Sequence, residues 1–169
     1  FGKVDCLLAN AGIGGGANKP ADVTLEEWNK VIGVNQTGIF LVNKYVIPYM
    51  IKNGGGSIVN TSSMYGLVGA PNSFAYTASK GAINQMTRTL SLAYAENNIR
   101  VNAIAPGFVD TAILSGVPDE YKKIMAKDMP IGRLGTDDEI ATLVKFLLSE
   151  ESSFMTGAII SIDGGYTAK

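Results

Sequence analysis

SIVNT (residues 57–61), FAYTASKGAINQM (74–86) and IRVNAIA (99–105) follow one another along this 169-residue chain and set its architecture. The outer two segments are short, apolar and rich in β-branched residues, which is typical of buried strands. The middle segment places apolar residues at helical spacing, and this pattern continues to about residue 96. A helix between two buried strands is the connection that parallel strands require. The three segments therefore predict a strand–helix–strand unit of a parallel sheet.

The same alternation continues on both sides of this unit. Two capping-box patterns, Thr24 with Glu27 and Thr136 with Glu139, predict helix starts, because the hydroxyl and the carboxylate satisfy free N–H groups. Strands are expected at 4–10 and 158–162, and helices at 24–34, 38–51, 119–127 and 136–148. Four strands with crossover helices predict an α/β fold with a doubly wound parallel sheet, in one domain that spans residues 1–169.

Composition excludes several classes of protein. The net charge is −1, the pI is near 5.4 and the 14 Lys and Arg residues are scattered, so no basic surface for nucleic acid is expected. The longest apolar runs are far shorter than the ~18 to 20 residues that cross a bilayer, so no membrane span is expected either. The chain opens without the features of a signal peptide, which predicts a cytoplasmic location.

The chain contains no histidine and a single cysteine. A zinc site would have to consist almost entirely of carboxylates, which is unusual for that metal, so no metal site is expected. Cys6 lies within an apolar run and is expected to pack as a small hydrophobic residue rather than to react. Without histidine, proton transfer near pH 7 must come from a carboxylate, a lysine, a thiol or a tyrosine with a shifted pKa.

Tyr76 and Lys80 are the strongest candidates for proton transfer. They are four residues apart in the helix expected at 74–96, so they lie on one helix face. Lowering a tyrosine pKa from ~10 to about 7 requires roughly 4 kcal/mol, and a cation ~4 Å away at an effective dielectric constant of ~20 contributes about that much. We expect Tyr76, with Lys80 beside it, to be the group that accepts and donates protons.

Seven motifs in order along the chain resemble those of the short-chain dehydrogenase/reductase family, in its compact single-domain form. Each motif is weak alone, but their joint order and spacing are specific. The motifs are Asn10-Ala11-Gly12 after the first strand, Asn35, Ser63, Tyr76-x-x-x-Lys80, Pro106-Gly107, Thr111 and Asp163-Gly164-Gly165. The resemblance implies a Rossmann-like sheet and an oxidoreductase that interconverts a secondary alcohol and a ketone with NAD(H) or NADP(H).

The resemblance also assigns roles to residues. The catalytic residues would be Asn35, Ser63, Tyr76 and Lys80, with Ser63 rather than Ser62 holding the substrate oxygen and Asn35 holding a water next to Lys80. The cofactor would be bound by Asn10, Ala11, Gly12, Tyr76, Lys80, Pro106, Gly107, Val109 and Thr111. The family usually pairs its two long helices, here 38–51 and 74–96, with a partner, so a homo-oligomer, a dimer or a tetramer, is expected.

One departure from the family pattern is large. The family opens with a strand and the Gly-rich cofactor loop T-G-x-x-x-G-x-G, and neither is present here. About 75 to 90 residues, which cover the first three strands, are therefore expected to be absent, at ~30 residues per strand–helix–strand unit. The choice between NAD and NADP is made on the second of those strands. The glycines at 12–16 are interpreted as a flexible loop, with a phosphate cradle as the alternative.

Several of these residues also have structural interpretations. Ser63 can cap its own backbone, Asn35 can stabilise its helix and Thr111 can cap a turn. Asp110 is interpreted as a solvated loop charge and Arg133 as a structural residue.

The substrate pocket is expected between residues 64–74 and 108–129. Its expected lining is mostly apolar: Met64, Tyr65, Leu67, Val68, Phe108, Ile113 and Leu114. No Arg or Lys lies in 64–74 or 108–114 to bind an anion. This predicts a small neutral alcohol or ketone, cyclic ones included, although these side chains could equally be core packing. An alternative function is a truncated, non-catalytic oligomerising domain that cannot bind a dinucleotide.

Overall fold

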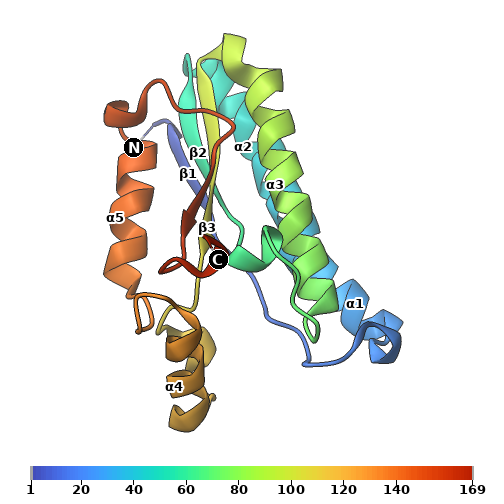
Figure 1. The fold of residues 1–169 in the computed structure, drawn as a ribbon. Coiled ribbons are helices and arrows are strands. Elements are labelled where there is room, and N and C mark those ends of the chain that lie inside the picture. The colour runs from blue at the N-terminus through green and yellow to red at the C-terminus, as the bar shows by residue number, and fades with distance from the viewer. Residues whose placement is uncertain (1, 169) are drawn as a thin grey trace.

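A computed structural model describes residues 2–168 and contains a four-stranded, fully parallel sheet in the order β1-β2-β3-β4. The strands are β1 (Cys6–Ala9), β2 (Gly56–Thr61), β3 (Ile99–Pro106) and β4 (Ile159–Ile162). Figure 1 shows the sheet between two layers of helices. The predicted strands and crossover helices, and with them the α/β Rossmann-like sheet, are confirmed.

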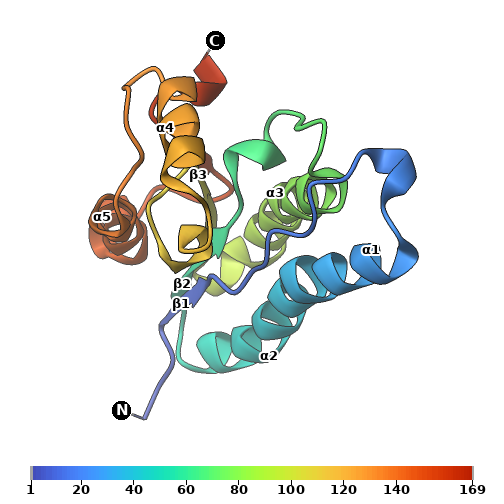
Figure 2. The same cartoon turned by 90° about the horizontal axis from the view of Figure 1, so that it is seen from below.

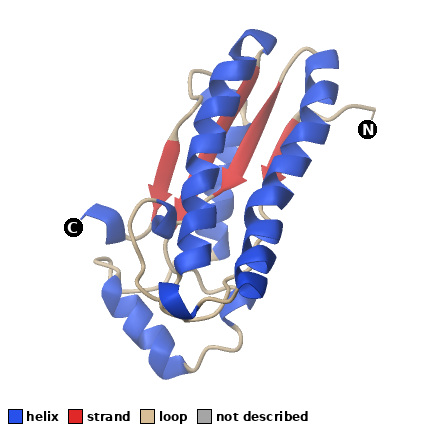
Figure 3. Cartoon of the chain, turned by 90° about the vertical axis from the view of Figure 1, so that its right-hand side faces the viewer, coloured by secondary structure: helices blue, strands red, loops and turns tan. Residues whose placement is uncertain are grey.

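The helices divide between the two faces of the sheet and one of its ends. Figure 2 shows α1 (Leu25–Ile32), α2 (Gly38–Lys52) and α3 (Phe74–Tyr94) together on one face and α5 (Asp137–Leu148) on the other. In Figure 3 the strand arrows point toward the end of the molecule where α4 (Asp119–Asp128) lies. That end carries the carboxyl ends of the strands, where open α/β sheets bind their ligands.

The core consists of two apolar layers because neighbouring residues of a strand point to opposite faces. Ile58 of β2 packs with Ile47 and Met50 of α2 on one side. The next residue, Val59, packs with Val144 and Leu147 of α5 on the other. Fully burying a side chain of this size stabilises the fold by ~1.5 to 3 kcal/mol. The two layers hold β2 and β3 rigidly, and with them the residues that follow each strand.

One of the two predicted capping boxes is complete, and the other is only half formed. The capping box of Thr136 and Glu139 is complete at the start of α5. At α1, Thr24 accepts the Glu27 N–H as predicted, but the Glu27 carboxylate instead accepts hydrogen bonds from Gly16 N and Asn18 Nδ2, both at 2.8 Å. Glu27 therefore anchors the glycine loop. A π-helical turn, Gly33–Thr37, joins α1 to α2 without the expected break.

Cys6 is exposed, so the prediction that it packs as a buried hydrophobic residue is wrong. Within the described residues β1 pairs only with β2, so it lies at an edge of the sheet. Leu8 on the same strand is 42% exposed, whereas Ala9 is buried. Cys6 and Leu8 point to one face of the strand and are exposed, whereas Leu7 and Ala9 point to the other face, where they pack against residues of α2.

Among residues 2–168, no helix is both long enough and apolar enough to cross a membrane.

Candidate active site

A cleft of about 1210 Å³ opens at the carboxyl ends of β1, β2 and β3. Except for Asn35, every residue that the sequence assigns to catalysis or cofactor binding lines this cleft. These residues come from four separate segments: Asn10–Gly12 after β1, Ser63 after β2, Tyr76 and Lys80 on α3, and 106–111 at the end of β3. Asn35 lies behind the cleft.

Ser63 follows the end of β2 and meets Tyr76. Its hydroxyl hydrogen-bonds to the Tyr76 phenol, and its Oγ accepts the Tyr65 N–H at 3.2 Å. The backbone-capping interpretation is therefore correct, and it coexists with the contact to Tyr76. Ser62 instead donates its hydroxyl to the Lys80 carbonyl at 3.1 Å. Of the two serines, Ser63 is the one whose hydroxyl meets the tyrosine.

Lys80 is deeply buried beside Tyr76. Lys80 is only 3% exposed, and its Nζ lies 5.5 Å from the centroid of the Tyr76 ring. The Nζ donates a hydrogen bond to the Thr61 carbonyl at 2.8 Å. Burial lowers the pKa of Lys80 to about 8, because the ammonium loses hydration that one carbonyl does not replace.

The expected lowering of the Tyr76 pKa toward 7 by Lys80 is not found. Burial raises the pKa of Tyr76 above its ordinary value, and the hydrogen bond with Ser63 offsets this only in part. The sequence argument counted the attraction of the ammonium but not the desolvation of the phenolate. Tyr76 is therefore protonated at neutral pH in this structure.

Asn35 lies in the π-helical turn, a feature that is frequent at functional sites. Its side-chain amide bonds on both sides: Oδ1 accepts the Ile13 N–H, and Nδ2 donates to the Ile13 carbonyl and to Ser79 Oγ. A Cβ on Gly12 would lie 3.4 Å from Asn35 Oδ1 and 3.5 Å from Lys80 Nζ, so all three meet beneath the cleft. Asn35 thus holds the loop after β1 against α3.

Two close approaches of the backbone shape the cleft. A Cβ on Gly107 would lie 2.8 Å from the Cα of Asp163, so only glycine lets the end of β3 pass the turn after β4. A Cβ on Gly66 would lie 2.8 Å from the carbonyl oxygen of Lys80. The loop that carries Ser63 therefore rests directly on the backbone of α3. On the other side, Asn10 Oδ1 accepts the Thr61 hydroxyl at 3.0 Å, which ties the ends of β1 and β2 together as expected.

The segment after Gly107 is held by backbone pairing with a distant loop. Gly135 donates its N–H to the Phe108 carbonyl at 2.9 Å and accepts the Asp110 N–H at 3.0 Å, on either side of Val109. The side chain of Thr111 makes no capping hydrogen bond, so the turn-capping alternative for it is wrong. Asp110 lies in a loop with its side chain 61% exposed, as interpreted, and it also forms an ion pair with Lys122 of α4 at 2.9 Å.

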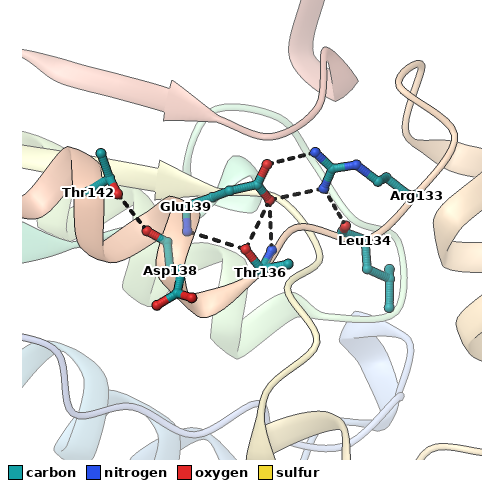
Figure 4. Close-up of polar contacts among 6 residues, drawn as sticks. All are labelled: Arg133, Leu134, Thr136, Asp138, Glu139 and Thr142. Atoms are coloured by element: carbon teal, nitrogen blue, oxygen red, sulfur yellow. Dashed lines mark hydrogen bonds and ion pairs between the residues drawn. The ribbon is translucent and has the colours of Figure 1, made fainter.

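Figure 4 shows how the loop around Gly135 is fixed to α5. Arg133 binds both carboxylate oxygens of Glu139 at 3.0 and 2.6 Å and donates to the Leu134 carbonyl. Glu139 also accepts the Thr136 N–H of the capping box. Arg133, followed by this backbone contact, lowers the pKa of Glu139 to about 2. These contacts agree with the structural interpretation of Arg133.

The pocket lining is partly as predicted. Met64, Tyr65, Phe108 and Leu114 line the cleft, whereas Leu67 and Val68 do not. The side chain of Ile113 lies outside what the structure describes. The sequence argument missed the α5 wall of the cleft, and it missed Tyr166, whose ring packs against Tyr65. The Asp163-Gly164-Gly165 turn was a signal for Tyr166, because Asp163 accepts both the Gly165 and Thr167 N–H groups and so folds the chain back.

Within residues 2–168 no cluster of three or more Cys, Asp or Glu residues could hold a metal ion.

The parallel sheet, with a Ser–Tyr–Lys set in a cleft at its carboxyl end, defines a class of proteins: α/β enzymes of the dinucleotide-binding type. Residues 1–167 match the family model described as enoyl-(acyl carrier protein) reductase. The chain belongs to the short-chain dehydrogenase/reductase family.

Similar proteins share most of this chain. It is 42% identical over 168 residues to a cis-4-hydroxycyclohexanecarboxylate dehydrogenase of Sinomonas cyclohexanicum, covering 99% of this chain and 68% of the relative. A cyclohexanol dehydrogenase of Acinetobacter sp. is 39% identical to this chain, and the match covers 66% of that relative. The solved structure "ElxO with NADP Bound" superposes with a TM-score of 0.95 at 34% identity, covering 100% of this chain and 69% of that one. This chain thus spans about two thirds of the length of these relatives.

The family and the NADP-bound neighbour confirm the expected cofactor class, NAD(H) or NADP(H). The residues present fit its nicotinamide-riboside end. Lys80 Nζ has one protein acceptor in the Thr61 carbonyl and faces the cleft, and Tyr76 lies beside it. Position 107 must be glycine because of the close approach of Asp163, and the absence of a side chain leaves room along the end of β3.

Proposed function

We propose that this chain carries the catalytic and substrate-binding part of an NAD(P)-dependent dehydrogenase that interconverts a small neutral secondary alcohol, preferably alicyclic, and its ketone. The convergence of Ser63, Tyr76 and Lys80 in one cleft carries this proposal. These side chains provide an oxygen-binding hydroxyl, a proton donor and a cation, which are the groups that carbonyl reduction needs.

In the proposed reaction Tyr76 transfers the proton. During reduction the protonated phenol donates its proton to the carbonyl oxygen, while the Ser63 hydroxyl donates a hydrogen bond to the same oxygen. The bound nicotinamide cofactor supplies or accepts the hydride. During oxidation the Tyr76 phenolate takes the alcohol proton, so the raised pKa of Tyr76 favours reduction at neutral pH. Below about pH 8 Lys80 is a cation, which stabilises the phenolate.

The remaining residues would hold the cofactor or its binding loops. Lys80 and Tyr76 would bind the ribose next to the nicotinamide, and the backbone near Val109 with Thr111 would bind the carboxamide. Asn10, Ala11 and Gly12 would form the opposite wall, with Pro106 and Gly107 at the end of β3. The side chain of Asn35 bonds to Ile13 and Ser79, and its Oδ1 keeps a second lone pair for the water expected next to Lys80. We also assign Asn35 the role of holding the loop after β1 beside Lys80.

A neutral alicyclic substrate is supported by the wall of the cleft and by the relatives. The substrate side of the cleft contains Met64, Tyr65, Phe108 and Leu114. The basic side chains that line the cleft are Lys80 and, on α5, Lys145. The names of two relatives, a cyclohexanol and a cis-4-hydroxycyclohexanecarboxylate dehydrogenase, share a six-membered ring and differ in the carboxylate. Because no further cation lines the substrate side, we assign the neutral ring to this chain.

The test is turnover followed by NAD(P)H absorbance. Cyclohexanol should be oxidised with NAD or NADP, at a kcat/KM at least tenfold above that for cis-4-hydroxycyclohexanecarboxylate. Titration of the same protein with each cofactor gives binding independently of turnover. If the protein bound neither cofactor, the enzyme proposal would be overturned in favour of the non-catalytic domain. A preference for the carboxylate would overturn the neutral-substrate assignment alone.

The length of the gene product is tested by its intact mass. A species near 17.8 kDa would be the chain as given. A species heavier by ~8 to 10 kDa would carry the three strand–helix–strand units that the family pattern adds. Turnover is measured on whichever species the gene produces.

Self-association is the second part of the proposal. On α2, Phe40, Tyr45 and Tyr49 are exposed, the last two to 63% each, and Leu92 of α3 is exposed to 83%. Large apolar side chains gathered on adjacent helices are typical of an interface. We propose that α2 and α3 pair with a second copy, giving a dimer or a tetramer. Light scattering should show a multiple of the chain mass, and Tyr45→Glu with Tyr49→Glu should reduce it; a wild-type monomer would contradict this.

A further inference from the structure

Tyr65 lies at the junction of the catalytic residues and the substrate side of the cleft. It lines the cleft together with Ser63 and Tyr76. Its backbone N–H donates to Ser63 Oγ at 3.2 Å, so its main chain orients the catalytic hydroxyl. Its side chain takes no part in that bond. A substitution at position 65 can therefore change the wall of the cleft without removing the support of Ser63.

Two aromatic residues far apart in the sequence hold the Tyr65 ring. Phe108, just after β3, meets it at a centroid distance of 6.0 Å and an interplanar angle of 85°. Tyr166, in the turn after β4, meets it at 6.1 Å and 78°. Both are edge-to-face contacts, which aromatic pairs favour beyond the burial of their area. The ring therefore has a fixed orientation, unlike a lone aromatic side chain on a loop.

The phenol of Tyr65 adds no charge to this wall. Burial, followed by the neighbouring Tyr166 that hydrogen-bonds with it, raises the pKa of Tyr65 well above its ordinary range. The hydroxyl is thus paired with Tyr166, and the side chain presents an uncharged ring.

We infer that Tyr65 is a specificity-determining residue whose ring, fixed by Phe108 and Tyr166, forms a rigid wall that selects alicyclic over open-chain substrates. The inference rests on the proposed alcohol/ketone function. A saturated six-membered ring has no freely rotating chain bonds, so it can lie against a rigid wall at a small entropic cost. An open chain of equal carbon number must lose rotational freedom to make the same contact.

The experiment compares cyclohexanone with 2-hexanone, which has the same number of carbons. Wild type should prefer cyclohexanone by at least tenfold in kcat/KM. Tyr65→Leu should reduce this preference to about threefold or less, through a higher KM for cyclohexanone with kcat within about threefold of wild type. Tyr65→Phe keeps the ring and should retain most of the preference. Phe154→Leu, the same kind of change at a fully exposed aromatic residue outside the cleft lining, should have no effect.

Tyr166→Leu provides a second variant in case Tyr65→Leu folds poorly. It removes one of the two contacts on the ring and leaves the Ser63 loop untouched, so the preference should fall about threefold. Thermal melting by circular dichroism confirms that each variant is folded. An unchanged preference in both folded variants would overturn the inference. So would an equal loss of kcat on both ketones, because Tyr65 would then act through Ser63.

Binding separates this inference from the proposed function. Saturation-transfer NMR of cyclohexanol and 2-hexanol, in the presence of NAD(P)H, which cannot accept a hydride from an alcohol, reports contact without turnover. Cyclohexanol should receive saturation from wild type and Phe154→Leu, and several-fold less from Tyr65→Leu. If wild type shows this selective binding but no turnover, the proposed reaction fails and the wall assignment stands. If wild type turns over cyclohexanone but Tyr65→Leu binds cyclohexanol equally well, the reaction stands and the wall assignment fails.

Discussion

The floor and the rim of the cleft are built differently. We define the floor as Asn35, Ser63, Tyr76 and Lys80, and the rim as residues 107–136. In the floor Asn35, Ser63 and Lys80 are buried. Asn35 hydrogen-bonds to Ser79 of α3, Lys80 to Thr61 of β2 and Ser63 to Tyr76 of α3. In the rim α4 buries no residue completely, and two surface ion pairs, Lys122–Asp110 and Arg133–Glu139, tie the segment down.

This difference separates chemistry from selection. Buried hydrogen-bond networks are costly to disturb, because a lost partner leaves a desolvated polar group. Exposed ion pairs contribute ~0 to 1 kcal/mol each, so the rim can change its shape or sequence at little cost in stability. The reaction is thus fixed in the part of the protein that tolerates change least, and the substrate contacts of Phe108 and Leu114 lie in the part that tolerates it most.

The largest expected contrast is between two tyrosines. Tyr76→Phe in the floor should lower kcat by at least 100-fold, because a positioned general acid or base contributes ~10² to 10⁴-fold. Tyr121→Phe, on the exposed surface of α4, removes the same hydroxyl from the rim and should stay within twofold of wild type. Steady-state kinetics with cyclohexanol measures both. If Tyr76→Phe kept more than about a tenth of the activity, Tyr76 would not be the proton donor.

Lys80→Met should separate stability from activity. The pKa of Lys80 is about 8 in the folded protein and 10.5 ordinarily. Above pH 10.5 the side chain is neutral and does not lower the stability of the fold. As the pH falls through 8 this stability is lost, because the buried amine becomes charged. At pH 7 the buried ammonium costs up to ~3 kcal/mol, reduced by its bond to Thr61, so the variant should be more stable by roughly 1 to 3 kcal/mol. Its kcat should fall at least tenfold.

Urea denaturation at pH 7 and at pH 10 measures the stability effect, and the gain should shrink at the higher pH. Lys123→Met on the exposed surface of α4 is the matched control and should change neither stability nor rate. A Lys80→Met protein less stable than wild type at pH 7 would show that the ammonium is well solvated.

The pH dependence of the reaction follows from Tyr76. Because its pKa is raised, oxidation needs a phenolate that is scarce at neutral pH, so kcat/KM for cyclohexanol should rise up to about tenfold per pH unit from pH 6 to 9. Reduction of cyclohexanone needs the protonated phenol and should stay nearly flat over the same range. A plateau for oxidation below pH 7 would indicate a lowered pKa instead.

The smallest effects are expected in the rim. Arg133→Met releases Glu139 and loosens the loop whose Gly135 pairs on both sides of Val109. The KM for the cofactor should rise about threefold, with the KM for cyclohexanol and kcat within about twofold. Lys122→Met breaks the other ion pair of the rim and should leave the cofactor KM unchanged. Equal effects of the two variants on cofactor KM would show that the pairing at Gly135 is not the link.

Local patterns predicted most of this architecture. The limits of α3 and of β2 and β3 follow apolar periodicity, which depends only on neighbouring residues, and the structure places them within about two residues of the prediction. The motifs that line the cleft were also visible, because most of them follow the end of a strand, and Tyr76 and Lys80 share one face of α3. The glycines at 12–16 form a loop, as interpreted, but the hydrogen bond from Gly16 to Glu27 was not predicted.

The failures of prediction involve contacts between distant segments. Cys6 is apolar in its neighbourhood but lies on a strand paired on one side only. The ion pair of Asp110 with Lys122 and the ring contact of Tyr65 with Tyr166 were not predicted. Both depend on how the chain after β3 folds back. The pKa of Tyr76 depends on how much water the fold removes, which the spacing to Lys80 does not contain.

The close approach at Gly66 has a consequence for how such a site can be altered in the laboratory. Any side chain there would push the serine loop away from the helix that bears the tyrosine, and would do so before it reached a ligand. In a saturation library selected for a new substrate, position 66 should return glycine, while its neighbours at 65 and 67 diversify. The contact between this loop and α3 thus separates a position that accepts only glycine from neighbours that can be substituted.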